Sequence, residues 1–255
     1  MSHPIILPSD AIAPSSPGAS DTPALRSFRD FYAFEQHVKT CRGHRGQEMI
    51  PAWYEIPVFY FSNPDSLVRD GAEVYAPRGC HKLDFELELG LVVGREGRDI
   101  DPSEAWDFVL GFTIVNDFSA RDLQRNEMRV GLGPAKGKDF ATAVGPAIVP
   151  LDKVQDRIDG NGRIDLAMTA RVDGRELSRG NSRDMYHSWP EMIAYASRDA
   201  TLQPGDLLGS GTVGTGCILE LGPDNTNGWL VPGNLVELEI ERLGVLTTRV
   251  VARPS

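Results

Sequence analysis

Apolar and acidic side chains alternate between positions 83 and 89, which is the two-residue period of a half-buried strand. The acidic positions Asp84, Glu86 and Glu88 therefore share one face, and we expect the two glutamates to lie about 7 Å apart along it. Glutamate is a poor strand former, so two on one face suggest a role beyond strand formation. The same alternation recurs over residues 237–241, which we interpret as a solvated face, so the spacing by itself does not separate a site from a surface.

A second apolar segment, residues 111–117, predicts a strand that ends in the carboxylate of Asp117 and leads into a helix over residues 119–128. Carboxylates on one strand face and at strand ends would suit a hard cation with oxygen ligands, Mg²⁺ or Ca²⁺. Four positions spaced by four, three and four residues fall on one side of this helix: Asp117, Arg121, Gln124 and Met128. A helix side that combines acidic, basic, amide and thioether groups is typical of a helix that lines a cleft, but a surface helix explains it equally well.

A helix is predicted over residues 26–39, because its apolar positions recur every three or four residues, at Phe28, Phe31, Phe34 and Val38. Asp30 and His37 are seven residues apart, so they would project from the same side of this helix, two turns removed. A carboxylate and an imidazole so placed could hold a metal ion and act as a base. On this spacing alone, the favoured alternative is an exposed pair on a surface helix.

Two further segments carry charged side chains that invite a chemical role. Glu220 falls inside the apolar run 217–221, which predicts a strand, and a buried glutamate needs a partner such as a histidine. The glycine-rich loop 131–139 carries Lys136 and Lys138, which could bind an anionic substrate or lie at the surface. This loop lacks the spacing of a nucleotide-binding motif.

The remaining elements complete a mixed, strand-rich pattern. Strands are predicted at 58–61, 147–149, 164–172, 235–241 and 245–251, and a helix at 190–198 after the capping-box pair Ser188 and Glu191. Glycines in 209–216 let backbone amides approach a ligand closely. Residues 1–24, rich in Pro, Ser and Ala, are expected to form a flexible or surface-wrapping arm, and residues 25–255 a single domain.

Net charge and cysteine content argue against several classes of protein. The chain has 255 residues and a net charge of −10 without any basic run, which argues against nucleic acid or an anionic membrane as a partner. The three cysteines, Cys41, Cys80 and Cys217, are odd in number and lack CxxC spacing. We therefore expect neither a disulfide framework nor a zinc cluster, and a cytoplasmic location fits best. No apolar run approaches the ~18 residues of a membrane-spanning helix.

Five motifs, taken as a set, resemble the fumarylacetoacetate hydrolase family over roughly residues 26–252. They are Asp30-Phe-Tyr-x-x-x-Gln-His37, Leu83-Asp-Phe-Glu-Leu-Glu88, Asn116-Asp117-x-Ser-Ala-Arg-Asp-Leu-Gln124, Gly133-Pro-x-x-Gly-Lys-x-Phe140 and Pro204-Gly-Asp-x-x-x-Ser-Gly-Thr212. The resemblance implies a mixed α/β, β-rich fold, a β-roll with peripheral helices, usually assembled as a homodimer. It also implies that the chain corresponds to the catalytic domain of that family.

The resemblance assigns roles to particular side chains. The implied metal ligands, for Mg²⁺, Ca²⁺ or Mn²⁺, are Asp30, Glu86, Glu88 and Asp117. The implied catalytic residues are His37 as base, Glu220 as its orienting partner, and Lys138 and Gln124 near the oxyanion, with Thr142 close to the metal. The implied substrate-binding residues are Arg121, Tyr32, Tyr60, Thr212, Arg45 and Met128. Met128 stands where the founding enzyme has a tyrosine, the loop 211–216 is shorter, and Arg45 departs slightly from the family's spacing.

The implied activity is divalent-metal-dependent hydrolysis of a C–C bond in a β-diketo acid, such as an acylpyruvate or a fumarylacetoacetate-like compound. His37, oriented by Glu220, would activate the water that attacks a metal-polarised carbonyl. The alternative is a lyase or isomerase (a decarboxylase, hydratase or tautomerase) acting on a 2-oxo acid in aromatic degradation. The presence of both His37 and Glu220 favours hydrolysis. A third hypothesis is a catalytically silent protein whose cation is structural.

Overall fold

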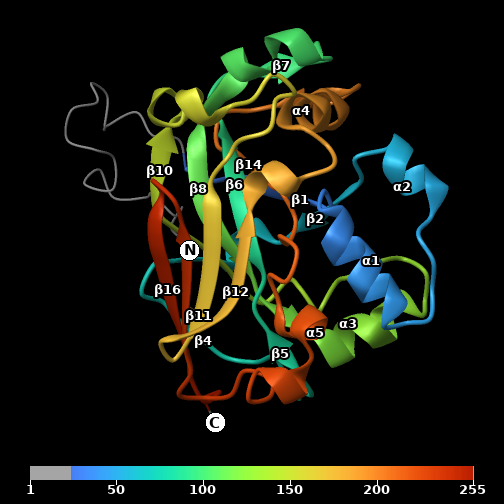
Figure 1. Cartoon of the computed structure of the whole chain (residues 1–255), viewed down its shortest axis with the longest axis vertical. Helices are drawn as coiled ribbons and strands as arrows, with labels where there is room; N and C mark the ends of the chain where they lie inside the picture. The colour runs from blue at the N-terminus through green and yellow to red at the C-terminus, as the bar shows by residue number, and fades with distance from the viewer. Residues whose placement is uncertain (1–23, 255) are drawn as a thin grey trace.

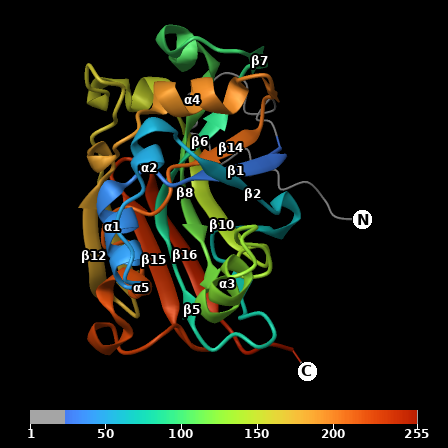
Figure 2. The same cartoon turned by 90° about the vertical axis from the view of Figure 1, so that its right-hand side faces the viewer.

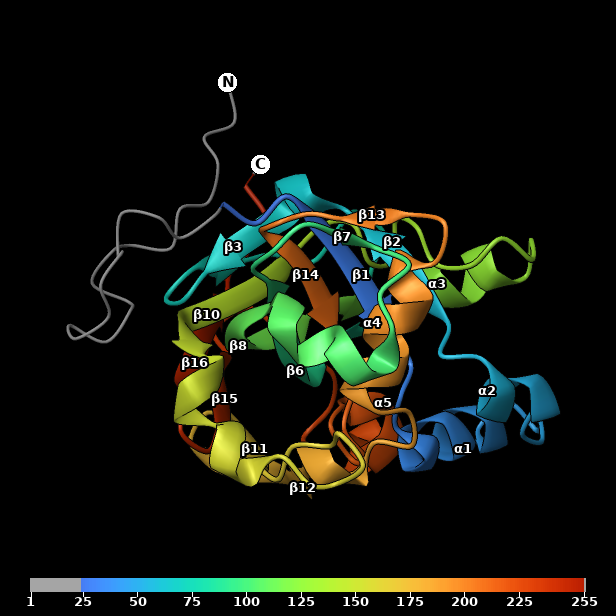
Figure 3. The same ribbon diagram turned by 90° about the horizontal axis from the view of Figure 1, so that it is seen from above.

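The protein folds into two curled β-sheets that enclose a common apolar core, with helices outside them (Figure 1). The computed structural model describes residues 24–254, so the expected N-terminal arm (1–24) lies outside the described residues except for its last position. Seen from above, the strands of the two sheets follow a curved line around the core (Figure 3). This arrangement confirms the predicted mixed, strand-rich roll with peripheral helices. Among residues 24–254, no helix combines the length and the apolar character that a membrane crossing requires.

The larger sheet has seven strands in the order β2-β1-β14-β6-β8-β10-β3. β1 pairs with β14 and β10 with β3 in parallel, and the other neighbours are antiparallel. The bounds are β1 Ser27–Phe31, β2 Phe59–Ser62, β3 Leu67–Arg69, β6 Leu87–Val93, β8 Val109–Asp117, β10 Thr142–Pro150 and β14 Asp206–Gly209.

The smaller sheet has five strands in the order β12-β11-β15-β16-β4, and β11, β15 and β16 overlap the strands predicted at 164–172, 235–241 and 245–251. The bounds are β4 Glu73–Val74, β11 Ala167–Val172, β12 Arg175–Asn181, β15 Leu235–Ile240 and β16 Gly244–Val250. Two short pairs add to these sheets, β13 (Thr201–Leu202) with β7 (Gly97–Arg98) and β5 (Leu83–Asp84) with β9 (Ser119–Ala120).

Helices α1, α2, α3 and α5 lie on one side of the roll, and α4 lies at one end (Figure 2). α4 begins with the predicted capping box, in which Ser188 and Glu191 bond reciprocally. The α-helices are α1 Glu35–Gly43, α2 Pro51–Glu55, α3 Arg121–Met128, α4 Trp189–Ser197 and α5 Ile218–Leu221. The 3-10 helices are η2 Pro64–Ser66, η3 Pro102–Phe108, η4 Leu151–Lys153, η5 Gln155–Arg157, η6 Ser182–Asp184 and η7 Pro223–Asn225.

Strand β6 is buried on both faces, so the half-buried strand predicted from the alternation at positions 83–89 is wrong. Its leucines enter the core between the sheets, while Val92 joins a smaller apolar cluster on the opposite face with Phe28 and Val115. The reason is its place between β14 and β8 in the interior of the larger sheet. Glu88 on this strand and Glu86 just before it are therefore buried, whereas Glu237 and Glu239 of β15 and the following Glu241 remain partly exposed.

Two predicted elements are wrong. Residues 27–31 form β1 and only residues 35–43 form a helix, so Asp30 and His37 do not share a helix face. Tertiary pairing decides this, because β1 lies between β14 and β2. Residues 218–221 form the one-turn helix α5 where a strand is predicted, and the Asp84 carboxylate accepts hydrogen bonds from the backbone N–H groups of Ile218 and Leu219 at its start.

Candidate active site

A cavity of about 310 Å³ opens between β1, β2, α1, α3 and the loop before β10. Most side chains assigned a role from the sequence line it: Asp30, Tyr32, His37, Arg45, Tyr60, Glu86, Glu88, Arg121, Gln124, Met128, Lys138 and Thr212. Asp117 and Glu220 lie behind this lining, each bonded to a side chain within it. The fold therefore gathers residues from distant parts of the chain around one space.

Three carboxylates meet at the inner end of the cavity. Oxygen atoms of Asp30, Glu86 and Glu88 all lie within 4.8 Å of one another, and the three residues are at most 4% exposed. Asp30 on β1 pairs with Gly209 of β14, which pairs in turn with Gly90 of β6, two residues beyond Glu88. A Cβ atom at Gly209 would lie 2.5 Å from Asp30 Oδ1 and 3.1 Å from Glu88 Oε2. The missing side chain therefore leaves room for two carboxylates to face each other.

The carboxylate pair is incompletely satisfied. Within residues 24–254, neither Asp30 Oδ1 nor Glu88 Oε2 has a hydrogen-bond donor. Burial, followed by the charge of Asp117, raises the pKa of Asp30 to about 8. Burial, followed by the charge of Asp30, raises the pKa of Glu88 well above its ordinary value. Facing buried carboxylates repel unless a proton or a cation lies between them, so these residues fit a divalent ion with oxygen ligands.

Asp117, the fourth expected ligand, lies at the end of β8 and is bonded to other side chains. It accepts hydrogen bonds from Thr142 Oγ1 at 2.9 Å, from Lys138 Nζ at 2.7 Å and from the Tyr60 hydroxyl. Lys138 also forms an ion pair with Glu86, so it joins Asp117 to the three-carboxylate cluster. Burial opposes ionisation of Lys138, but Asp117 and Glu86 outweigh it and hold the pKa of Lys138 above its ordinary value.

Arg121 connects the carboxylate cluster to helix α5. Its guanidinium lies 2.8 Å from Asp84 and 2.7 Å from Glu86, and Gln124 accepts a further bond at 3.3 Å. Burial opposes ionisation of Glu86, but Lys138 and Arg121 outweigh it and lower the pKa of Glu86 below its ordinary value. Arg121 is only 6% exposed, so its principal contacts in the structure are protein carboxylates.

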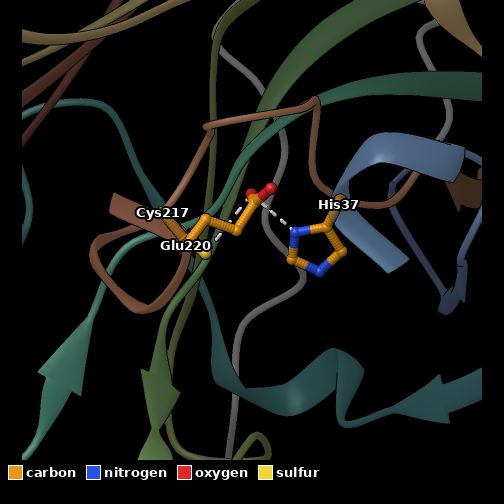
Figure 4. Close-up of side chains that lie close together, drawn as sticks. All are labelled: His37, Cys217 and Glu220. Carbon is orange, nitrogen blue, oxygen red and sulfur yellow. Dashed lines mark hydrogen bonds and ion pairs between the residues drawn. The ribbon is translucent and has the colours of Figure 1, made fainter. Parts of the chain in front are cut away.

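His37 on α1 is paired with Glu220 on α5 (Figure 4). Its Nδ1 lies 2.7 Å from Glu220 Oε2, and the other carboxylate oxygen accepts a hydrogen bond from the backbone N–H of Thr215. The histidine is 4% exposed and lines the cavity, and the Tyr32 ring stands edge-on to it at 5.4 Å. Burial opposes protonation, yet the bonds to Cys217 and Glu220 outweigh it and raise the pKa of His37 well above its ordinary value.

The outer end of the cavity is cationic. A neighbouring cavity of about 390 Å³ shares part of its wall and is lined by five arginines and, within the described residues, by no acid. The arginines are Arg42, Arg45, Arg121, Arg125 and Arg129. Met128, 43% exposed, lies at this end with its sulfur 3.9 Å from Arg45. At the inner end, Thr212 Oγ1 donates to Glu88 over 3.4 Å.

The family model for the C-terminal domain of fumarylacetoacetate (FAA) hydrolase matches residues 26–251, which is most of the chain. The chain belongs to the fumarylacetoacetate hydrolase family. This finding confirms the resemblance inferred from the five sequence motifs.

Fumarylacetoacetase from Arabidopsis thaliana is 32% identical over 246 residues, covering 77% of this chain and 58% of that protein. The 4-hydroxyphenylacetate degradation bifunctional isomerase/decarboxylase from Escherichia coli is 30% identical, covering 79% of this chain and 43% of that protein. The crystal structure of fumarylpyruvate hydrolase from Pseudomonas aeruginosa, in complex with Mn²⁺ and pyruvate, is 26% identical with a TM-score of 0.73. The structural similarity covers 94% of this chain and 98% of the fumarylpyruvate hydrolase chain. The chain thus spans about half the length of the two curated relatives, and the family includes both hydrolases and isomerase/decarboxylases.

Sequence reasoning missed several residues that shape this family site. Gly209 leaves room for two carboxylates, and its only sequence signal is the cluster of glycines that begins there. Asp84 fixes the start of α5, although its alternation with Glu86 and Glu88 suggested a shared face. Cys41 and Cys217 flank the His37 imidazole, and their separation in sequence offered no signal.

Proposed function

We propose that the protein is a divalent-metal-dependent hydrolase that cleaves a C–C bond of a β-diketo acid, such as an acylpyruvate or a fumarylacetoacetate-like compound. The observation that carries this proposal is the juxtaposition of an unsatisfied carboxylate cluster and a histidine–glutamate pair around one cavity of about 310 Å³. The arginines at the outer end support an anionic substrate, because they provide positive charge where a small acid would enter.

Asp30, Glu86, Glu88 and Asp117 would hold the cation, which when bound polarises the oxygens of a 1,3-dicarbonyl acid. Mg²⁺, Mn²⁺ and Ca²⁺ all accept such an oxygen-only ligand set. Lys138 is positively charged and lines the cavity wall, and Gln124 supplies an amide beside it, so both are suited to stabilise a developing oxyanion.

His37 and Glu220 would activate water. Because Nδ1 is engaged by Glu220, Nε2 is the ring nitrogen left to accept a proton from a water molecule in the cavity. The hydroxide adds to the carbonyl carbon, the C–C bond breaks, and the proton is delivered to the carbon that leaves. Water is thereby divided between the two products. Glu220 keeps the imidazole in the required tautomer and compensates its positive charge after the transfer.

A lyase or isomerase acting on a 2-oxo acid is the alternative, supported by the similarity to the E. coli isomerase/decarboxylase. The His37–Glu220 pair favours hydrolysis, because a paired base has a direct role in activating water.

A spectrophotometric screen of acylpyruvates and other diketo acids, with Mg²⁺, Mn²⁺ or Ca²⁺ and with chelator, tests the proposal. We expect cation-dependent C–C hydrolysis by the wild type, loss in His37→Ala, and retention in His81→Ala, which removes an exposed imidazole. Decarboxylated product alone from a 2-oxo diacid would establish the alternative. Wild-type and His37→Ala proteins that are equally inert but bind metal equally well would indicate a structural cation.

We also propose that the protein forms a homodimer, as the sequence resemblance implies. Size-exclusion chromatography with light scattering should give twice the mass of one 27.9 kDa chain. A mass of one chain at assay concentration would refute this expectation.

A further inference from the structure

Two thiols lie against the His37–Glu220 pair. Cys41 follows His37 by one turn of α1, and its sulfur lies 3.9 Å from Nδ1 and 3.7 Å from Nε2 of the imidazole. Cys217 precedes α5, and its sulfur lies 3.6 Å from Glu220 Oε2. Donor atoms of His37, Cys217 and Glu220 all lie within 4.8 Å of one another (Figure 4). Both cysteines are buried and free, so each can supply a sulfur ligand.

We propose that Cys41, His37, Cys217 and Glu220 form a second metal site, distinct from the carboxylate cluster, which binds a thiophilic divalent ion such as Zn²⁺. We further infer that its occupation inhibits the enzyme. The inhibition rests on the proposed function, in which His37 is the base, whereas the binding does not.

Two sulfur contacts are close to the spacing of tetrahedral coordination. Zinc–sulfur bonds of about 2.3 Å and zinc–nitrogen or zinc–oxygen bonds of about 2.0 Å place neighbouring donors about 3.3 to 3.8 Å apart. The separations of Cys217 Sγ from Glu220 Oε2 (3.6 Å) and of Cys41 Sγ from His37 Nδ1 (3.9 Å) are close to this range. The His37–Glu220 contact, at 2.7 Å, is shorter than this range, because a proton now joins the two atoms. It would have to lengthen by about 0.6 Å when the ion replaces that proton.

The donor set selects a different ion from the carboxylate cluster. Thiolate and imidazole favour Zn²⁺, whereas Mg²⁺ and Ca²⁺ prefer an all-oxygen set such as Asp30, Glu86 and Glu88. Binding requires each thiol to lose its proton to solvent, and the proton that His37 Nδ1 shares with Glu220 to move to Nε2 of the same ring. His37 and Cys41 line the cavity, so an ion can reach the site from the space that would admit the substrate.

Occupation would block the base. An ion on Nδ1 displaces Glu220 from the imidazole and leaves the ring proton on Nε2, the nitrogen that is otherwise free to accept a proton from water. His37 would then be a donor where the reaction needs an acceptor. The same imidazole cannot serve both purposes, so Zn²⁺ at this site should lower kcat while excess Mg²⁺ fails to restore it.

Titration of Co²⁺ into the metal-free protein in excess Mg²⁺ tests the binding, because only a thiolate ligand gives cobalt an intense charge-transfer absorption. We expect this absorption in the wild type and in Cys80→Ser, a control whose thiol neighbours Lys82 and Asp122. We expect its loss in Cys217→Ser. Cys41→Ser is a second variant should Cys217→Ser fail to fold by circular dichroism. Zn²⁺ should displace Co²⁺ and abolish the absorption.

The midpoint for Zn²⁺ inhibition should rise at least about tenfold in Cys217→Ser, since loss of even an outer partner of a metal site has such an effect. A folded wild-type protein without the absorption, or an absorption that survives in both Cys217→Ser and Cys41→Ser, would overturn the second site. Cobalt absorption in a protein inert on every diketo acid would retain the site and reject the proposed function. Hydrolysis of a diketo acid without cobalt absorption would support the proposed function and reject the second metal site.

Discussion

Cation binding at the carboxylate cluster should strengthen steeply between pH 6 and pH 8. Burial and Asp117 raise the pKa of Asp30 from 3.8 to about 8, so the folded, metal-free protein carries a proton there at neutral pH. A cation needs the carboxylate and must displace that proton. Below pH 8 each pH unit then weakens the apparent affinity about tenfold, or about 1.4 kcal/mol. From pH 8 to pH 6 the loss is about fiftyfold, about 2.3 kcal/mol, for one proton.

Glu88 should steepen this dependence, because its pKa is also raised well above the ordinary value. If both carboxyl groups are protonated, two protons must leave when a cation binds, so the dependence on pH is steeper than for one proton. The sign for stability follows from the same pKa values. The unfolded chain releases its Asp30 proton near 3.8, whereas the folded chain holds it to about 8, so the metal-free protein should lose stability as pH rises across that window.

Isothermal titration calorimetry with Mn²⁺, in paired buffers of different ionisation enthalpy, measures both the affinity and the protons released at pH 6, 7 and 8. Glu239→Gln, a change on the partly exposed face of β15, is the control and should behave as wild type. Glu88→Gln should bind more weakly and release fewer protons. An affinity independent of pH over this range, with no proton released, would show that the cluster is already ionised in the metal-free protein and refute the reasoning.

Three further outcomes follow from the site. Glu88→Ala should abolish metal-dependent turnover while Glu239→Ala leaves it nearly unchanged, and equal losses in an activity assay would place the metal elsewhere. Glu220→Gln should move the acid limb of kcat/KM to lower pH, because the carboxylate raises the pKa of the base His37 against the effect of burial, and an unmoved limb would assign it to another group. Gly209→Ala should weaken Mn²⁺ binding at least about tenfold, since its Cβ would meet Asp30 Oδ1 at 2.5 Å, and unchanged affinity by calorimetry would contradict this.

Much of the sheet architecture could be predicted from local patterns. The strands of hairpin β15–β16 follow from alternating apolar residues on either side of the turn, and the capping box marks the start of α4. These features are encoded within a few neighbouring residues. The partners of β6 and β14 are not, because the larger sheet joins strands from distant segments, and no local pattern states which strand lies between which.

The errors arise where tertiary contacts overrule a local period. Phe28, Phe31 and Phe34 recur at helical spacing, yet residues 27–31 pair with β14 and β2 and the helix starts only at Glu35. An apolar run as short as 217–221 is compatible with either a strand or a helix turn. The carboxylate of Asp84, far away in the sequence, selects the helix by accepting two backbone N–H groups.

The misread acid at position 84 explains how the two halves of the site are held together. Asp84 fixes the start of α5, the helix that carries Glu220, and Arg121 bridges the same carboxylate to Glu86 of the acidic cluster. The His37–Glu220 pair and the proposed cation site are therefore connected through the buried guanidinium of Arg121 rather than placed independently. The alternation of acids in the sequence does mark the site, but the three acids differ in their contacts. Asp84 fixes the helix that carries Glu220, while Glu86 and Glu88 belong to the carboxylate cluster proposed to hold the cation. Spacing indicates that acids recur, and only the paths of the surrounding strands decide what each of them contacts.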